Sequence, residues 1–277
     1  MTVFEILLPA FVASLILTGI HAYLGVHVVE RGVIFVDLSL AQIAALGTTV
    51  AYLAGYDLHS TTAYLFSLGF TFLGAAIFAM SRSHSRKTRI PQEAIIGIVY
   101  AVSAAVAILV MSKATQETEH LKEMLVGNIL SVSWSELFKT AALYLLVGFF
   151  HYLFRRRFLL ISMNEPEAER QGLNIRFWDF LFYISFGFVV TSSVAIAGVL
   201  LVFCFLIVPA VSAMLFSERL GPRLAIGWTM GAIVSALGVC LSYVWDLPTG
   251  ATIVGTFGAA LLVIAGYRRA FRPAAGT

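Results

Sequence analysis

The sequence predicts an all-α polytopic membrane protein with eight or nine transmembrane helices, built as a single integral-membrane domain over residues 1–277. Apolar residues make up 60% of the chain, while Asp, Glu, Lys and Arg together make up only 12%. Soluble domains contain about 45–50% apolar and about 25% charged residues. The mean hydropathy is +0.91. So few charges could not cover a water-exposed surface, which excludes a soluble enzyme, a disordered chain and a nucleic-acid-binding domain.

Apolar stretches of about 20 residues, the length that crosses a bilayer core about 30 Å thick, recur along the whole chain. In order, the predicted spans cover residues 4–28, 32–53, 61–80, 93–111, 137–154, 178–194, 198–216, 224–245 and 250–267. Only residues 195–197 separate the sixth from the seventh, so eight spans with one broken helix is the alternative. The start of the chain lacks a basic region and a cleavage site, which predicts a retained first helix rather than a signal peptide.

The distribution of Lys and Arg predicts the orientation. If the N-terminus lies outside, 15 of the 18 basic residues fall on the inner side, and only Lys113, Lys122 and Lys139 remain outside. Because cytoplasmic loops carry the excess of basic residues, we expect an outer N-terminus and a cytoplasmic C-terminus. Residues 113–136 then form the longest outer loop and residues 155–179 the longest cytoplasmic loop.

The predicted outer loop carries a small acidic cluster. Its members are Glu117, Glu119, His120 and Glu123. Such a cluster can simply be a solvated face of the protein. It can also attract cations to an entrance, or contact a protein that delivers them.

A short helix is predicted within the cytoplasmic loop. Asn164 is a favourable N-cap, and Pro166 suits a first turn, where a missing N–H costs nothing. Glu167 complements the positive end of the helix, and Gly172 can take the left-handed conformation that ends it. This helix is either an ordinary connector or a docking helix for a cytosolic partner.

Several segments, in order along nearly the whole chain, resemble those of one known family. They are residues 31–37, 125–133, 168–172, 198–202, 206–210 and 246–254. Residues 125–133 are similar to an outer "FGNIL.VS" stretch, and residues 198–210 to a "GVLLV" and "LLxPA" pattern. Residues 246–254 are similar to a "DLPTGPTIV" stretch before the last helix. The chain thus resembles the membrane permease subunits of the zinc/manganese (metal) ABC importer family.

The resemblance implies a transporter of several subunits in a prokaryotic inner membrane. It implies the fold of the vitamin B12 importer permeases with about one helix fewer, and a pore formed by a homodimer. Two cytosolic ATPase subunits would dock on a coupling helix that contains Glu167, Ala168 and Gly172. An extracytoplasmic metal-binding protein would deliver the ion. ATP would bind on the partner subunit, so we expect no catalytic site and no permanently bound cofactor here, only a transported divalent metal ion.

Two residues in the second predicted span are candidate metal ligands. Asp37 matches the position at which the family carries an Asp, and a lone carboxylate within a span must face protein, water or an ion. The family has a His four residues later, whereas this chain has Gln42 five residues later. Five residues correspond to about 140° around a helix, so the two side chains diverge. A Gln oxygen is also a harder ligand than imidazole.

Two other spans contribute further ionisable side chains. His21 in the first span could supply the missing imidazole, or it could be a hydrogen-bonded packing residue. Glu93 and His151 are expected near the inner interface, where they would anchor their spans.

The leading interpretation is therefore the permease of an ABC importer for zinc, manganese or iron, driven by a separate ATPase. A permease for iron–siderophore or cobalamin is the nearest alternative, although such chains are usually longer. A secondary transporter driven by an ion gradient often shows inverted repeats, and none is visible in this sequence. An intramembrane enzyme would need a nucleophile with a base, or paired carboxylates, at membrane depth.

Overall fold

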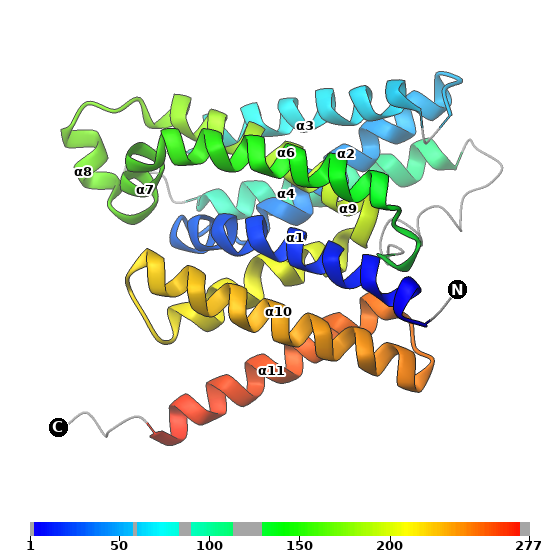
Figure 1. The fold of residues 1–277 in the computed structure, drawn as a ribbon. Coiled ribbons are helices and arrows are strands. Elements are labelled where there is room, and N and C mark those ends of the chain that lie inside the picture. The colour runs from blue at the N-terminus through cyan, green and yellow to red at the C-terminus, as the bar shows by residue number, and fades with distance from the viewer. Residues whose placement is uncertain (1–2, 58–59, 83–89, 113–128, 272–277) are drawn as a thin grey trace. The chain divides into compact units, whose positions relative to one another are not determined.

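The computed structural model describes residues 3–57, 60–82, 90–112 and 129–271, and these residues form an all-helical protein (Figure 1). The elements are α1 (Val3–Glu30), α2 (Val36–Leu53), α3 (Thr61–Ser81), α4 (Gln92–Met111), the short 3₁₀ helix η1 (Ile129–Ser131), α6 (Trp134–Leu153), α7 (Arg155–Met163), α8 (Glu165–Arg170), α9 (Ile175–Met214), α10 (Leu220–Trp245) and α11 (Thr249–Phe271). Among the described residues, seven helices are long and apolar enough to cross a membrane. The number rises to eight if α6 and α7, which meet at 76°, count as one span. The predicted polytopic helical fold is confirmed.

Helix α9 explains why eight spans, with α6 and α7 counted together, stand where the sequence predicted nine stretches. It has 40 residues and contains both the sixth and the seventh. A straight helix of this length would measure about 60 Å, roughly twice the bilayer core. Gly198, with φ 75° and ψ 162°, interrupts the helical geometry and divides α9 into two halves. The break falls at Gly198 because only glycine takes this backbone conformation easily. Residues 195–197, predicted as a connection, are helical.

The helices form two compact units. Unit 1 comprises Met1–Val29, Val126–Ala141 and Ile196–Thr277, and unit 2 comprises Glu30–Leu125 and Ala142–Ala195. Each unit is described by itself.

In unit 2, α2 packs against α3 and α4. The α2–α3 approach depends on Gly47, where an added Cβ would lie 2.8 Å from the carbonyl oxygen of Phe66. The first half of α9 packs on α3 through aromatic side chains, and the rings of Phe72 and Phe188 meet edge to face at 5.1 Å. Such aromatic pairs stabilise a helix contact beyond their buried area. These contacts help to set the positions of the beginning of α2, the end of α3 and the beginning of α9.

In unit 1, α1 contacts the second half of α9 and also α10. An added Cβ at Gly25 would lie 2.0 Å from the carbonyl oxygen of Leu206, so α1 and α9 touch backbone to backbone there. Trp228 Nε1 donates a hydrogen bond of 2.9 Å to the carbonyl of Gly19 and links α10 to α1. Within this unit, α1 begins at the end where α10 finishes, and α11 finishes at the other end (Figure 1).

The segment between α6 and α9 contains two helices instead of the single one predicted. Asn164 caps α8 as expected, since its side chain accepts a hydrogen bond from the N–H of Glu167 at 3.2 Å. Gly172 follows with φ 73°. Helix α7 was not predicted, although Phe158, Ile161 and Ser162 are buried at helical spacing. Helices α7 and α8 lie together at one end of unit 2 (Figure 1).

Candidate functional site

Asp37 lies in the first turn of α2, closer to the helix beginning than predicted. The span was expected from residue 32, but the chain turns at Gly32, which has φ 66°, and α2 begins only at Val36. The N–H of Val36 donates to the carbonyl of Val33 at 3.1 Å within this turn. Asp37 therefore sits at the positive end of the helix, where a negative charge is stabilised.

The Asp37 side chain is buried, with an exposed fraction of 1%, and neither of its carboxyl oxygens has a hydrogen-bond partner among the described residues. An unpaired buried carboxylate costs several kcal/mol, because the charge loses its water without gaining a partner. The two Asp37 oxygens could therefore accept a cation at the beginning of α2.

A second carboxylate reaches the same helix beginning from α4. Glu93 Oε1 accepts a hydrogen bond of 2.9 Å from the N–H of Phe35, the residue before α2. Glu93 Oε2 is buried and has no hydrogen-bond partner among the described residues. The sequence predicted Glu93 only as an anchor near the inner interface. Its contact with α2 depends on the packing of α2 against α4, which no local pattern reveals.

The structure does not bring Gln42 or His21 together with Asp37 within one unit. Helix α2 is continuous from Val36 to Leu53, so Gln42 is rotated by about 140° from Asp37, as predicted. His21 lies in unit 1 and is fully buried, with Nδ1 2.7 Å from the carbonyl oxygen of Leu17. This contact fits the packing interpretation of His21. A role for either residue as a metal ligand stays a prediction.

Among the described residues, no group of three His, Cys, Asp or Glu side chains could hold a metal ion. The predicted outer cluster, Glu117, Glu119, His120 and Glu123, lies outside the described residues. Asp37 and Glu93 are two described carboxylates with buried oxygens that have no hydrogen-bond partner among the described residues.

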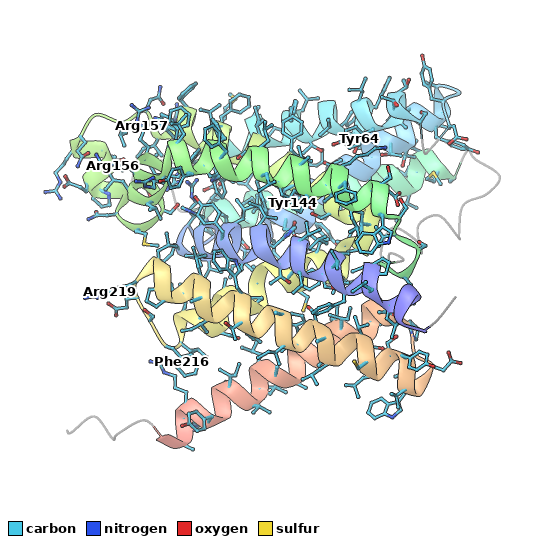
Figure 2. All side chains as sticks on the ribbon, viewed as in Figure 1. Tyr64, Tyr144, Arg156, Arg157, Phe216 and Arg219 are labelled. Carbon is cyan, nitrogen blue, oxygen red and sulfur yellow. The ribbon has the colours of Figure 1, made fainter. Side chains whose placement is uncertain are left out.

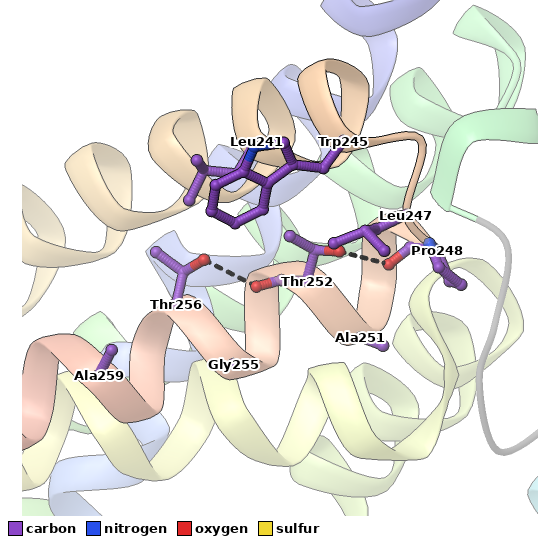
Figure 3. A pocket seen from close by; sticks show the side chains of 9 residues that line it. All are labelled: Leu241, Trp245, Leu247, Pro248, Ala251, Thr252, Gly255, Thr256 and Ala259. Carbon is purple, nitrogen blue, oxygen red and sulfur yellow. Dashed lines mark hydrogen bonds between the residues drawn. The ribbon is translucent and has the colours of Figure 1, made fainter.

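A groove between α10 and α11 in unit 1 has a different character (Figure 3). Its lining residues are Leu241, Trp245, Leu247, Pro248, Ala251, Thr252, Gly255, Thr256 and Ala259. None of them is ionisable, and the hydroxyls of Thr252 and Thr256 donate to the backbone carbonyls of Pro248 and Thr252, at 2.9 Å and 2.7 Å. The groove therefore offers no charged ligand for a metal ion.

Basic side chains of unit 2 lie at the end that carries α7 and α8. Arg156 and Arg157 lie at that end, whereas Tyr64 and Tyr144 lie farther along the helices (Figure 2). His151, expected as an interface anchor, is buried, with Nε2 2.7 Å from Ser185 Oγ.

A buried charge cluster occupies the same end. Asp179 in the first turns of α9 is fully buried and pairs with two arginines. Its Oδ1 lies 2.5 Å from Arg31 Nη1, and its Oδ2 lies 2.5 Å from Arg82 Nη1. From the sequence, Arg31 and Arg82 were only two of the basic residues on the inner side, and Asp179 was only the last residue of the predicted cytoplasmic loop. A lone Asp near the start of an apolar span was the available signal, but its partners come from distant segments.

Arg82 extends this cluster to α8. Its Nη2 lies 2.8 Å from Glu165 Oε2, and its Nε donates to Glu165 Oε1 at 3.2 Å. Burial alone would lower the pKa of Arg82, but Asp179 and Glu165 together raise the pKa above its ordinary value. Arg82 therefore stays charged and connects the end of α3 to the beginnings of α8 and α9.

The remaining residues of α8 divide into an inner and an outer face. Ala168 is fully buried, whereas Arg170 is exposed and pairs with Glu167 at 2.6 Å. A large charged residue in place of Ala168 would thus disturb the packing of α8 itself. The exposed Glu169 and Arg170 are better positions for testing whether a partner docks here.

Comparisons with known proteins agree with this architecture. Residues 3–268 match the ABC 3 transport family. The chain is 27% identical over 256 residues to the manganese transport system membrane protein MntC of Listeria monocytogenes, covering 91% of this chain and 86% of the relative. It is 24% identical over 260 residues to the manganese import system permease protein ScaB of Streptococcus gordonii, covering 94% and 90%.

The fold is similar to that of a chain in the solved structure of PsaBC from Streptococcus pneumoniae in complex with Fab. The TM-score is 0.76 at 23% identity, over 95% of this chain and 91% of the other. The family match over nearly the whole length confirms the resemblance that the motifs indicated. The protein is a multi-pass membrane protein of a bacterial membrane, and it is the membrane component of an ABC transporter complex rather than its ATPase. The chain belongs to the ABC 3 transport family, as a permease of the metal-importer type.

Proposed function

We propose that this permease imports manganese ions and that the Asp37 carboxylate is an anionic ligand on their path. The observation that carries the proposal is a buried carboxylate with no hydrogen-bond partner among the described residues. Carboxylate and amide oxygens suit Mn²⁺ better than Zn²⁺, which favours imidazole and thiolate. The two relatives named for manganese support the same choice. Iron and zinc are the competing cargoes.

The energy for import comes from a partner. We propose that a cytosolic ATPase docks on the exposed face of α8 and that two copies of the permease enclose the path. An extracytoplasmic protein delivers the ion. The capped, surface-facing helix between α6 and α9 supports the docking position. Exchanging charge at exposed Arg170, as in Arg170→Glu, should reduce co-purification of the ATPase. Unchanged co-purification would contradict docking at this face.

The cargo is tested by uptake of radioactive Mn²⁺. The permease is produced with its ATPase and delivery protein in a strain that lacks other manganese importers. The Asp37→Asn variant keeps the side-chain shape but removes the charge, so uptake should fall to background at an unchanged amount of assembled complex. Ser39→Ala, two residues along the same buried turn, is the matched control and should retain uptake. Normal uptake by the Asp37→Asn variant would remove Asp37 from the path.

Competition separates the candidate cargoes. Excess unlabelled Mn²⁺, Fe²⁺ or Zn²⁺ is added in separate arms, and an iron–siderophore complex in a further arm. We expect Mn²⁺ to compete most strongly. Stronger competition by Zn²⁺ or by the siderophore complex would overturn manganese as the cargo.

A further inference from the structure

We infer that Arg82 is a positioning residue that transmits movement of α8 to the membrane-spanning helices α3 and α9. The inference rests on the proposed docking of an ATPase at α8. It goes further, because it names the side chains that carry the motion into the membrane domain. Arg82 follows the last residue of α3 directly and bonds at once to Glu165 on α8 and Asp179 on α9.

The inner part of this connection is rigid. Both oxygens of the fully buried Asp179 are occupied, by Arg31 and Arg82. Arg31 also donates to Ser162 Oγ of α7 at 2.8 Å, and its guanidinium lies 4.0 Å from the ring centre of Phe182. Both side chains of the Arg31–Asp179 pair are buried away from water, and these additional contacts help to offset the cost of burying the charges. These ion pairs thus hold three places together: Arg31 after α1, Arg82 after α3, and the beginning of α9.

The outer part is more open to change. Glu165 has a side chain that is 36% exposed, in contrast to the fully buried Asp179. Its two oxygens hold the guanidinium of Arg82 in a paired geometry, which fixes direction as well as distance. A displacement of the first turn of α8 therefore pulls on Arg82, and Arg82 pulls on the rigid part.

The four charges balance. Arg31 and Arg82 supply two positive charges, and Asp179 and Glu165 supply two negative charges. Neutralising the exposed member alone leaves Arg82 paired with Asp179, so the buried part survives. Replacement of Glu165 therefore cuts the transmission without removing the rigid part.

The test uses the purified complex of permease, ATPase and delivery protein in lipid vesicles. Glu165→Gln keeps the length and hydrogen-bonding groups of the side chain but removes its charge. We expect the variant to assemble and to hydrolyse ATP, while the number of metal ions imported per ATP falls about threefold, the scale of one lost, partly exposed ion pair. Glu218→Gln is the matched control, because it neutralises an exposed glutamate in the α9–α10 connection. Its ratio should equal that of the wild type.

A second measurement does not depend on the cargo. Backbone hydrogen exchange at the end of α3 is compared with and without bound ATP. The wild type and Glu218→Gln should show a nucleotide-dependent change there, and Glu165→Gln should not. A wild-type response preserved in Glu165→Gln, or an unchanged ratio of ions to ATP, would overturn the role of Arg82. Failure of the wild type to import any of the metals would instead overturn the proposed function, and the exchange measurement would still decide the inference.

Discussion

Arg31 and Asp179, which are 148 residues apart in sequence, form an ion pair of 2.5 Å with side chains that are 1% and 0% exposed. Arg31 follows α1 directly, and Asp179 lies near the start of α9, so the pair joins two segments of unit 2 that no local interaction connects. Removing two charges from water is costly, and close geometry with additional bonds is needed to offset that cost. The pair is consequently a position where loss of one partner has a large effect.

We predict that Asp179→Asn strongly destabilises the protein. The change leaves two buried guanidinium groups with too little negative charge, and breaking a buried pair costs about 3–5 kcal/mol. Thermal unfolding of the purified protein in detergent measures the effect. Glu167→Gln is the control, because its partner Arg170 is 74% exposed and such a pair contributes about 0–1 kcal/mol. Equal melting temperatures for the two variants would contradict the buried pair.

Asp37→Asn should have the opposite effect on stability. In the absence of metal, the Asp37 carboxyl is buried without a hydrogen-bond partner among the described residues, and an amide is less costly to bury than a carboxylate, so Asp37→Asn should raise the free energy of unfolding. A functional residue often carries such a cost. The same thermal measurement, made in chelator, checks the sign. A lower melting temperature for Asp37→Asn would show that the carboxylate has a structural partner.

The helices themselves were predictable because their cause is local. A run of about 20 apolar residues in a bilayer must be helical, since no water is available to the backbone. The cap at Asn164 and the positive φ at Gly172 also follow from side-chain chemistry within one turn. Periodicity could not show that the backbone stays helical through residues 195–197 and breaks at Gly198, because both sides of the break are equally apolar.

The candidate site was only partly predictable. Asp37 stood out because an ionisable residue in an apolar run is unusual. The contact of Glu93 with Phe35 and the pairing of Asp179 with Arg31 and Arg82 join residues that are distant in sequence. Their positions depend on helix packing, which one sequence does not encode in any local pattern.

Gln42→His should move metal preference toward Zn²⁺. The substitution supplies an imidazole, a softer ligand than an amide oxygen, on the same helix as Asp37. Competition of Zn²⁺ against radioactive Mn²⁺ uptake, measured in wild type and variant, checks the shift. Gln42→Asn, which keeps an amide oxygen, serves as the control. Identical competition curves for all three proteins would place Gln42 away from the ion path.

Gly25→Ala should destabilise unit 1. The added methyl group would lie 2.0 Å from the carbonyl oxygen of Leu206, which is backbone and cannot rotate away. Overpacking of this kind costs about 1–3 kcal/mol. Gly69→Ala is a suitable control, because an added Cβ there meets nothing within 4 Å. The melting temperatures of the two variants in detergent give the comparison, and an unaffected Gly25→Ala protein would contradict the close contact of α1 with α9.

The orientation of the chain gives the last prediction. With the N-terminus outside, 15 of the 18 basic residues lie on the inner side. In unit 1, the beginning of α1 and the finish of α11 lie at opposite ends, which supports termini on opposite sides of the membrane (Figure 1). We therefore expect Thr118→Cys to react with a membrane-impermeant thiol reagent in intact cells, and His84→Cys to react only after the cells are opened.

Both labelling variants are made in a background in which Cys204 and Cys240 are replaced by Ala, because either native thiol could give a false signal. Each variant must first support metal uptake, so that only correctly inserted protein is scored. The outer position then lies in the longest predicted outer loop, and the inner position lies among the basic residues that follow α3. Because a membrane-impermeant reagent cannot cross the bilayer, labelling of His84→Cys in intact cells would reverse the orientation. It would also place α8 on the outside, out of reach of any cytosolic ATPase.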